Sequence, residues 1–481
     1  MQLSVVVLAA GKGTRMKSSR AKVLHPLAGR PLIEHVLRTV DALKPVRTVL
    51  VIGHGADAVR NALADRTSLD FVVQSPQLGT GHALLQAEQV LAGNTGTVLL
   101  LYADVPLLEA ATLTRLLESH HAAHAAATVL TTVVDEPYGY GRIVRDNAGA
   151  IERIVEERDA SGDERAIKEI NSGIYAFSLA PLFTSLHELE TDNAQEEYYL
   201  TDLIGMYRQR GLCVETLCLD RADELRGVNT RGDLADISVI LRARKNRALM
   251  LGGVSFENPA TTLVDDEVTV GADTVLGPGV LLQGRTTIGA GCRIEANVRL
   301  TNATVGDEVT ILDHSVILES TVGSGASVGP FAHIRPGSVI ESDARVGNFV
   351  ELKKTRLGHH SKANHLAYLG DATIGDDVNV GAGTITCNYD GVNKNPTIIE
   401  DGVFIGSDTQ LIAPVRIGKG AYVAAGSSIT EDVPPGALGI ARGRQENKAD
   451  WVAVRQARRL REKELKSAGA KPPGTKKKGT R

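Results

Sequence analysis

The chain has 481 residues, a length that suits about three domains, each large enough to bury its own core. Its net charge of −4 excludes a general attraction to nucleic acid, and its composition, with 49 glycines and only 4% aromatic residues, suits thin repeats better than an aromatic-rich sandwich. The four cysteines lack metal-type spacing, and their small number is typical of reduced thiols in a cytosolic protein. The apolar N-terminal stretch is too short to span a membrane. We therefore expect a cytoplasmic protein without nucleic-acid or membrane partners.

Strand-like and helical stretches alternate over roughly the first 230 residues. This alternation predicts an α/β domain over residues 1–231, with a parallel sheet, helices on both faces and ligands beyond the carboxyl ends of the strands. The expected buried strands are Leu3–Leu8, Arg47–Ile52, Phe71–Gln74, Val98–Tyr102 and Thr128–Val134, and the expected helices include Leu32–Leu43 and Gly81–Ala92.

A glycine-rich loop follows the first strand directly, as Leu8-Ala9-Ala10-Gly11-Lys12-Gly13-Thr14-Arg15. It is not a Walker P-loop, and it is not a complete dinucleotide fingerprint because Met16 stands where the third glycine would be. Glycines after a buried strand let backbone N–H groups approach a phosphate, and Arg15 and Lys22 supply positive charge. From these residues alone, a phosphate-binding loop and a plain turn both remain open.

Two other predicted strands are also followed by polar groups. Asp104 places a carboxylate where Mg²⁺ shared with phosphates prefers oxygen ligands, although a helix N-cap role for this residue remains open. Gln74 and the run Leu78-Gly79-Thr80-Gly81 offer amide and backbone groups suited to the edge of a base, with a simple turn as the alternative for the glycines.

A capping box marks the start of a helix at the end of this half, with Thr230 followed three positions later by Asp233. Apolar residues follow at helical spacing and basic residues load the final turns, which the helix dipole favours. The pattern predicts a linker helix over residues 232–252, roughly 30 Å long. The apolar residues are Leu234, Ile237, Ile240 and Leu241, and the basic ones are Arg242, Arg244, Lys245 and Arg247.

Aliphatic residues recur every six positions in most of the remaining chain. Neither a helix of 3.6 residues per turn nor a strand with two-residue alternation explains this period, whereas a hexapeptide β-helix does. We therefore predict a parallel β-helix domain over residues 253–481, with the aliphatic residues in its core and glycines at its corners. The runs are Val270, Leu276, Leu282, Ile288, Ile294 and Leu300; Val305 and Ile311; Val322, Val328, Ile334, Ile340, Val346 and Leu352; and Ile405, Leu411, Ile417, Val423 and Ile429.

Two polar stretches interrupt the repeat and indicate a site, because a solenoid core needs neither. The basic stretch 353–366 contains His365, a residue type suited to proton transfer near neutral pH, and Lys353, which with Arg335 would clamp a phosphate. Exposed corner residues are the alternative, and a histidine metal site is disfavoured because no suitably spaced carboxylate or thiolate accompanies it. The stretch TCNYDGVNKNPTIIED predicts a projecting loop, and its Cys387 is a poor candidate for an acyl-carrying nucleophile because no base is evident beside it.

The chain ends in a charged helical segment after Trp451 and the sequence KPPGTKKKGTR. We expect a disordered, solvated tail from about residue 467, with contact to RNA or a membrane as the disfavoured alternative.

The loop Leu-x-x-Gly-x-Gly-Thr-Arg-Met followed by Ala21-Lys22-Val23-Leu24 resembles the signature of sugar-nucleotide pyrophosphorylases. Joined to the hexapeptide repeats, the chain resembles the bacterial bifunctional N-acetylglucosamine-1-phosphate uridyltransferases/glucosamine-1-phosphate acetyltransferases over all but about the last twenty residues. The resemblance implies a Rossmann-like nucleotidyltransferase domain, a linker helix and a left-handed β-helix that forms a homotrimer. It also implies acetylation of glucosamine 1-phosphate by acetyl-CoA, then transfer of UMP from UTP to N-acetylglucosamine 1-phosphate with release of pyrophosphate.

The same resemblance assigns roles to residues of the first half. The residues implied for the nucleotide are Leu8, Ala9, Ala10, Gly11, Gln74, Gly79 and Thr80, and those for the phosphates are Arg15 and Lys22. The residues implied for the sugar are Tyr102, Ala103, Asp104, Gly141, Glu156 and Asn171, and those for Mg²⁺ are Asp104 and Asn229.

In the second half, the resemblance makes His365 the base that takes a proton from the sugar amine as it attacks the thioester. The residues implied for the sugar phosphate are Arg335, Lys353, Tyr368 and Asn379. The residues implied for acetyl-CoA are Ala382, Asn388, Tyr389, Ser407, Ala425 and Arg442.

The chain departs from the family pattern at three positions: Ala21 stands where Pro is common, and Ala103 and Asn364 stand where Gly is common. None removes a reacting group, although Ala103 is expected to add a methyl group near the sugar.

Two rival interpretations remain. A pyrophosphorylase for ADP-glucose or dTDP-glucose with a structural β-helix would lack the HHSKANHL and ITCNYDG stretches. A non-enzymatic assembly subunit of the translation-factor type is disfavoured by the joint presence of Arg15, Lys22, Asp104 and Asn229.

Overall fold

The structure, a computed structural model, describes residues 2–468, so the KPPGTKKKGTR tail lies outside the described residues. Contacts divide the chain into two units, one up to Lys354 and one from Thr355 onward. This division falls inside the hexapeptide repeats, so the domain boundaries predicted from the sequence stay predictions.

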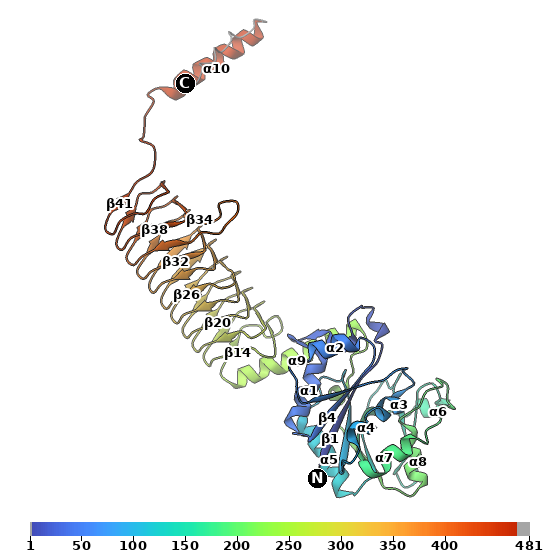
Figure 1. Cartoon of the computed structure of the whole chain (residues 1–481). Coiled ribbons are helices and arrows are strands. Elements are labelled where there is room, and N and C mark those ends of the chain that lie inside the picture. Colours follow the sequence, from blue (N-terminus) through green and yellow to red (C-terminus); the bar gives the residue numbers. More distant parts are fainter. Residues whose placement is uncertain (1, 469–481) are drawn as a thin grey trace. The chain divides into compact units, whose positions relative to one another are not determined.

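The first unit begins with a nine-stranded sheet of order β11-β7-β10-β6-β1-β4-β5, with the β8–β9 hairpin attached to β10 (Figure 1). Strand β1 pairs in parallel with both β4 and β6, as the alternating pattern predicts, and β4 pairs in parallel with β5. The strands are β1 Leu3–Ala9, β4 Arg47–Ile52, β5 Leu69–Val73, β6 Thr97–Tyr102, β7 Ala127–Val133, β8 Arg142–Arg145, β9 Ile151–Val155, β10 Glu169–Ser178 and β11 Val214–Leu219, with a small separate ladder of β2 Pro26–Leu27 and β3 Arg30–Pro31.

One strand departs from the predicted parallel sheet. Strand β10 runs antiparallel to both β6 and β7. Between β7 and β10 the chain forms the β8–β9 hairpin without a crossover helix, and Glu169 at the start of β10 pairs with Val133 at the end of β7. Strand β10 therefore begins beside the end of β7, so the two strands run in opposite directions.

Helices cover both faces of this sheet because alternate residues of the strands are apolar on both sides. Val6 and Leu8 of β1 join one buried cluster with Leu84 of α3, whereas Val5 and Val7 join another with Leu37 of α1. The helix expected over 81–92 is divided into α3 and α4. The helices are α1 Leu32–Ala42, α2 Ala56–Ala62, α3 Thr80–Leu85, α4 Glu88–Leu91, α5 Ala110–Ala122, α6 Gly162–Arg165, α7 Leu179–Leu186 and α8 Asp202–Gln209.

The helix α9 spans Arg231–Leu251, and the predicted capping box is present at its start. The Thr230 side chain accepts from the N–H of Asp233, whose carboxylate in turn accepts from the N–H of Thr230. Ile237 of α9 is buried in a cluster with Met16 and Leu32, which packs the first turns of the helix onto the α/β domain. None of the described helices is both long enough and apolar enough to cross a membrane.

The hexapeptide repeats of the first unit form three parallel ladders, β12-β15-β18-β21-β24-β27, β13-β16-β19-β22-β25-β28 and β14-β17-β20-β23-β26 (Figure 1). All predicted core positions of these coils are buried except Val270, which is half-buried. The strands are β12 Ser255–Phe256, β13 Leu263–Val264, β14 Thr269–Val270, β15 Val275–Leu276, β16 Leu281–Gln283, β17 Thr287–Ile288, β18 Arg293–Ile294, β19 Arg299–Thr301, β20 Thr304–Val305, β21 Thr310–Ile311, β22 Val316–Leu318, β23 Thr321–Val322, β24 Ser327–Val328, β25 His333–Ile334, β26 Val339–Ile340, β27 Arg345–Asn348 and β28 Glu351–Lys353.

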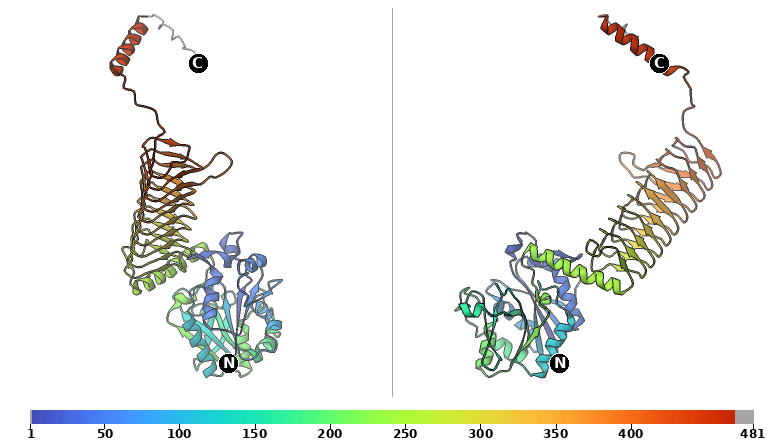
Figure 2. Two further views of the ribbon diagram at one scale, coloured as in Figure 1. Left: turned by 60° about the vertical axis from the view of Figure 1, so that its left-hand side comes forward. Right: turned by 180° about the vertical axis from the view of Figure 1, so that it is seen from behind.

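The second unit repeats the same coils, so the predicted fold class of both halves, a nucleotidyltransferase domain and a parallel β-helix, is confirmed. Within the second unit, the part of the basic stretch interpreted as a break that starts at Thr355 forms regular coils, because Leu357 and Ala363 are buried in the core. The projecting loop is present between β34 and β35 (Figure 2). The elements are β29 Arg356–Leu357, β30 Lys362–His365, β31 Tyr368–Gly370, β32 Ala372–Ile374, β33 Asn379–Val380, β34 Ile385–Cys387, β35 Thr397–Ile399, β36 Phe404–Ile405, β37 Gln410–Ile412, β38 Val415–Ile417, β39 Tyr422–Val423, β40 Ser428–Ile429, β41 Leu438–Gly439 and α10 Trp451–Ser467.

Candidate active sites

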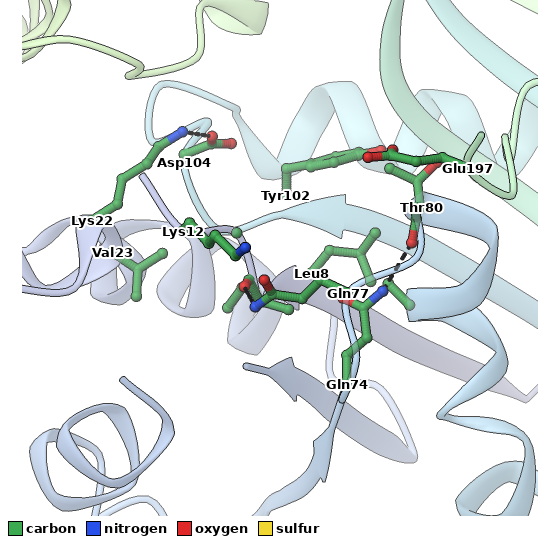
Figure 3. A pocket seen from close by; sticks show the side chains of 15 residues that line it. Leu8, Lys12, Lys22, Val23, Gln74, Gln77, Thr80, Tyr102, Asp104 and Glu197 are labelled. Carbon is green, nitrogen blue, oxygen red and sulfur yellow. Dashed lines mark hydrogen bonds and ion pairs between the residues drawn. The ribbon is translucent and has the colours of Figure 1, made fainter. Parts of the chain in front are cut away.

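A cavity of about 450 Å³ opens at the carboxyl ends of β1, β5 and β6. Figure 3 shows Lys22 and Asp104 on one side of it, Tyr102, Thr80 and Glu197 on another, and Gln74 below. The lining residues predicted from the sequence are Leu8, Ala9, Ala10, Gly11, Lys22, Gln74, Gly79, Thr80, Tyr102 and Asp104. The predicted residues of the cavity therefore come from four separate stretches of the chain.

The glycine-rich loop turns sharply at Gly13 and brings Lys22 to the cavity. Gly13 has a φ of 60°, and a Cβ atom there would lie 2.7 Å from the Cβ of Lys22. Only glycine fits both the left-handed backbone and this close approach. The turn leads into a short 3-10 helix, Thr14–Met16, which contains Arg15.

Four polar side chains from three distant parts of the chain meet beside the cavity. Lys22 Nζ forms an ion pair with Asp104 Oδ2, drawn as a dashed line in Figure 3, and donates to Asn229 Oδ1 at 3.1 Å. Arg15 Nη2 donates to the same Asn229 oxygen at 2.9 Å. The predicted phosphate cations and the predicted metal ligands are therefore in direct contact with one another.

The backbone fixes the two oxygen-bearing residues next to each other. Val228 N–H donates to the carbonyl of Asp104 at 2.8 Å. Asn229 N–H donates to Asp233 Oδ2 at 2.9 Å, so the capping box of α9 also holds Asn229. Burial would raise the pKa of Asp233, but the N–H donors of Asn229 and Thr230 lower it, which keeps the carboxylate ionised and able to accept both bonds.

The donor set of Asp104 and Asn229 fits a hard divalent cation. Both oxygens bond to one ammonium nitrogen, so a single cation placed between them would reach both. Carboxylate and amide oxygens are ligands that Mg²⁺ accepts.

Gln74 follows β5 and lies at the base of the cavity with only 5% of its surface exposed. Its amide nitrogen donates to the carbonyl of Gly79 at 2.9 Å. Gly79 has a φ of 104°, and a Cβ atom there would lie 2.7 Å from the carbonyl oxygen of Tyr198, so this turn also requires glycine. The loop that begins α3 is thereby held against both Gln74 and the segment around Tyr198.

Of the six residues predicted for the sugar, Gly141, Glu156 and Asn171 lie close to one another. Gly141 accepts from the N–H of Asn171 at 2.9 Å, and a Cβ atom at Gly141 would lie 3.6 Å from Glu156 Oε2. Burial raises the pKa of Glu156, opposed by the hydroxyl of Thr201 at 3.2 Å. Burial, aided by the charges of Glu156 and Asp104, also raises the pKa of Tyr102, so this phenol stays protonated and available as a donor.

Sequence reasoning missed several lining residues and misjudged one side chain. Lys12, Val23, Gln77, Ala83 and Glu197 also line the cavity. The position of Lys12 between two loop glycines was a usable signal, whereas nothing in the sequence around Glu197 pointed to the site. The methyl group expected near the sugar is instead packed in the core, because Ala103 is 1% exposed and belongs to a buried cluster.

In the hexapeptide coils of the first unit, Arg335 and Lys353 lie on adjacent coils. The register pairs Ile334 with Leu352, and Arg335 N–H donates to the carbonyl of Leu352 at 2.8 Å. The Arg335 guanidinium also donates to Glu351 Oε1 at 2.8 Å, which holds it beside the same strand. Two cations one coil apart suit the oxygens of a phosphate.

In the second unit, predicted acetyl-CoA residues stack on successive coils along one edge. Gly383 N–H donates to the carbonyl of Leu366, next to His365, and Asp408 N–H donates to the carbonyl of Ala382. On the following coils Gly426 N–H donates to the carbonyl of Ser407, and Arg442 Nη1 donates to that of Ala425 at 2.8 Å. The resulting column contains His365, Ala382, Ser407, Ala425 and Arg442, and the His365 side chain is exposed.

The remaining predicted residues of this unit lie in three environments. Asn379 pairs with Lys362 in the ladder of β30 and β33. A Cβ atom at Gly370 would lie 2.5 Å from the Tyr368 hydroxyl and 2.9 Å from Asn388 Nδ2, so these two side chains are neighbours. Tyr389 is exposed in the projecting loop, with Lys394 Nζ 4.0 Å from its ring centroid.

Family models cover both halves of the chain. The MobA-like NTP transferase domain matches residues 5–172. The GMPPB C-terminal domain matches residues 259–362, and six repeats of the bacterial transferase hexapeptide match residues 396–431.

Curated relatives match along nearly the whole chain. The bifunctional protein GlmU of Pelobacter propionicus is 49% identical over 449 residues, which are 93% of this chain and 98% of the relative. Those of Trichlorobacter lovleyi and Shouchella clausii are 50% identical over 448 residues and 49% identical over 447, each covering 93% of this chain and 97% and 98% of the relative. The chain therefore belongs to the family of the bifunctional GlmU proteins, and the resemblance to bifunctional uridyltransferase/acetyltransferase enzymes that its motifs indicate is confirmed.

Proposed function

We propose that the chain makes UDP-N-acetylglucosamine in two steps, by acetylating glucosamine 1-phosphate with acetyl-CoA and then transferring UMP from UTP to the product. The observation that carries the proposal is the meeting of Arg15, Lys22, Asp104 and Asn229 beside one cavity. Two cations and two oxygen ligands are the groups that phosphoryl chemistry requires, and they come from three distant parts of the chain.

In the uridylyl step, an oxygen of the sugar 1-phosphate attacks the α-phosphorus of UTP in line with the leaving pyrophosphate. Arg15 and Lys22 offset the negative charge that develops on the phosphate oxygens. Gln74 and the backbone of Gly79 and Thr80 hold the base, while Tyr102, Gly141, Glu156 and Asn171 orient the sugar. Catalysis by positioning and charge requires no protein nucleophile.

Mg²⁺ is the metal that we assign to Asp104 and Asn229. When bound, it would supply a positive charge that neutralises the phosphates. Lys22 would then exchange its present contacts with these two oxygens for contacts with the nucleotide.

In the acetyl step, the amine of glucosamine 1-phosphate attacks the thioester carbonyl of acetyl-CoA while His365 takes a proton from the nitrogen. The carbon–sulfur bond breaks, and coenzyme A leaves as a thiolate that then takes up a proton. General-base assistance of this kind is worth about 10²- to 10⁴-fold in rate. Arg335 and Lys353 bind the phosphate, Tyr368 and Asn379 contact the sugar, and the column from Ala382 to Arg442 together with Asn388 and Tyr389 binds acetyl-CoA.

We also infer a homotrimer built through the β-helix, because hexapeptide coils expose His365 and the projecting loop in the single chain and a neighbouring copy would enclose them. Sedimentation of the full chain tests this, and a monomer at micromolar concentration would contradict it. A cytoplasmic location belongs to the same proposal, since UTP and acetyl-CoA are supplied there.

The direct test supplies the purified full chain with glucosamine 1-phosphate, acetyl-CoA, UTP and Mg²⁺ and analyses the products. We expect UDP-N-acetylglucosamine, coenzyme A and pyrophosphate, and we expect preformed N-acetylglucosamine 1-phosphate to remove the need for acetyl-CoA. Formation of ADP-glucose or dTDP-glucose from glucose 1-phosphate, without the acetyl reaction, would favour the rival pyrophosphorylase.

A further inference from the structure

The amide of Gln74 has a second neighbour that the proposed reaction does not use. Its nitrogen, which donates to the carbonyl of Gly79 at 2.9 Å, also lies 3.2 Å from Nδ1 of His82. His82 is half-buried in α3, behind the cavity wall, and is not among the residues that line the cavity.

These two contacts determine which end of the Gln74 amide faces the cavity. A backbone carbonyl only accepts hydrogen bonds, so the amide nitrogen has to point toward Gly79. If Nδ1 of His82 accepts the second hydrogen, both N–H groups are engaged and the Oε1 atom is left as an acceptor for a ligand.

The His82 ring is in a state that can accept at Nδ1. Burial lowers the pKa of His82, which favours the neutral ring at neutral pH. With Nδ1 accepting, the ring proton is on Nε2. The half-buried Gln86 amide, whose nitrogen lies 3.2 Å from Nε2, then donates only to the carbonyl of His82, at 3.0 Å.

The ring is also held in place. It stacks on Tyr198, with ring centroids 6.3 Å apart and an interplanar angle of 30°. Gly81 N–H donates to the carbonyl of Tyr198 at 2.9 Å, and Tyr198 N–H donates to the carbonyl of Leu78 at 2.9 Å. The loop that carries Gly79 and the segment that supports His82 therefore form one connected unit.

We propose that His82 is a positioning residue for base selection, which holds the Gln74 amide with its oxygen toward the nucleotide. This inference rests on the proposed use of UTP. Uracil presents an N–H donor at N3, which pairs with an acceptor, whereas cytosine presents an acceptor at N3, which the same oxygen repels. A fixed Gln74 amide thus selects UTP over CTP, while thymine, which has the same N–H, is not excluded by this contact.

Two substitutions distinguish the role of the Nδ1 acceptor of His82 from the role of its aromatic ring. His82→Phe keeps an aromatic ring for stacking on Tyr198 but has no acceptor, and His82→Asn restores an acceptor oxygen near the position of Nδ1. For His82→Phe we expect the KM for UTP to rise about 3- to 10-fold, the range expected from one hydrogen bond, with little change in kcat or in the KM of the sugar phosphate. We expect the ratio of kcat/KM for UTP over CTP to fall by a similar factor and His82→Asn to recover most of it.

The measurement is the UTP to CTP ratio, together with calorimetric affinities of the full chain for each nucleotide. Equal losses for UTP and CTP in His82→Phe, an unchanged ratio, or no recovery in His82→Asn would overturn the inference. Gln74→Ala distinguishes this failure from a failure of the proposed function. If Gln74→Ala weakens UTP binding while His82→Phe does not change the ratio, only the role of His82 is wrong. If neither substitution affects UTP, the proposed base site itself is wrong.

Discussion

The capping box of α9 gives a quantitative prediction because it serves both a helix and the proposed metal site. Asp233→Ala removes the carboxylate that accepts from the N–H of Asn229 at 2.9 Å and from that of Thr230 at 2.8 Å. The Asn229 side chain lies between Arg15 and Lys22, so freeing its backbone should displace the oxygen that both cations contact.

The size of the effect follows from the two lost bonds. Loss of a helix N-terminal cap costs about 0.5–2 kcal/mol. Asp233 is half-buried, so water replaces part of what the carboxylate provided, and we take about 1–1.5 kcal/mol as the loss. Expressed in the activation barrier, this is about a 5- to 12-fold fall in the rate of uridylyl transfer. Because the pKa of Asp233 is lowered in the folded chain, the contribution is fully present at neutral pH and is lost only as the pH falls through that lowered value.

The assay is uridylyl transfer from UTP to N-acetylglucosamine 1-phosphate at varied Mg²⁺, with acetyl transfer measured on the same preparation. We expect Asp233→Ala to lower the uridylyl rate and to raise the Mg²⁺ concentration needed for half of it, without changing acetyl transfer. Asp236→Ala is the matched control, because this exposed residue lies in the same helix and its carboxylate contacts Arg226 at 3.2 Å instead of the backbone of Asn229. Identical kinetics of the two variants would refute the role of the capping box in holding Asn229.

Three further predictions concern the first unit. Gly13→Ala should lower uridylyl transfer at least about 10-fold, because the added Cβ would lie 2.7 Å from Lys22 at a φ of 60°; a wild-type rate would show that the loop relaxes freely. His120 is 2% exposed, and burial, with the charge of His121, lowers its pKa to about 4. The contribution of His120 to the free energy of unfolding is therefore fully present above about pH 6.5, the ordinary pKa of histidine, and decreases as the pH falls toward 4. His120→Gln should therefore reduce the loss of thermal stability between pH 7.5 and pH 5, with the exposed His124→Gln as a control that should not. Chelation of divalent cations should stop uridylyl transfer and spare acetyl transfer, and loss of both would argue against separate sites.

The β-helix was predictable because its pattern is local and repeated. Each six-residue repeat buries an aliphatic residue at the same position, and few other structures have a period of six residues. The prediction failed where small or shifted residues continue the core. Leu357 follows Leu352 after five positions and Ala363 is too small to stand out, yet both are completely buried. From Thr355 onward, the basic stretch therefore forms regular coils with Leu357 and Ala363 in the core.

The α/β domain was less predictable because one strand depends on long-range pairing. The segment 169–178 follows the β8–β9 hairpin and the short helix α6, and its direction is set by its pairing with the end of β7. The alternation of strand-like and helical stretches in the sequence does not indicate the direction of this strand.

The candidate uridylyl site was predictable to the extent that its residues lie in recognisable motifs. Arg15, Lys22, Asp104 and Asn229 were each placed in such a motif, and the structure brings them together. Glu197 lies instead in a segment without regular structure, held to the site by the backbone bonds of Tyr198 to Leu78 and Gly81. His82 was missed for a related reason, since its contact with Gln74 depends on how the loop between them folds.

The central claim is that one chain carries two independent reactions at separate sites. The most direct measurement determines both activities for His365→Ala and for Asp104→Ala, each as the full chain. The account predicts that His365→Ala loses acetyl transfer and retains uridylyl transfer from preformed N-acetylglucosamine 1-phosphate, while Asp104→Ala shows the reverse. Equal loss of both activities in either variant would contradict it.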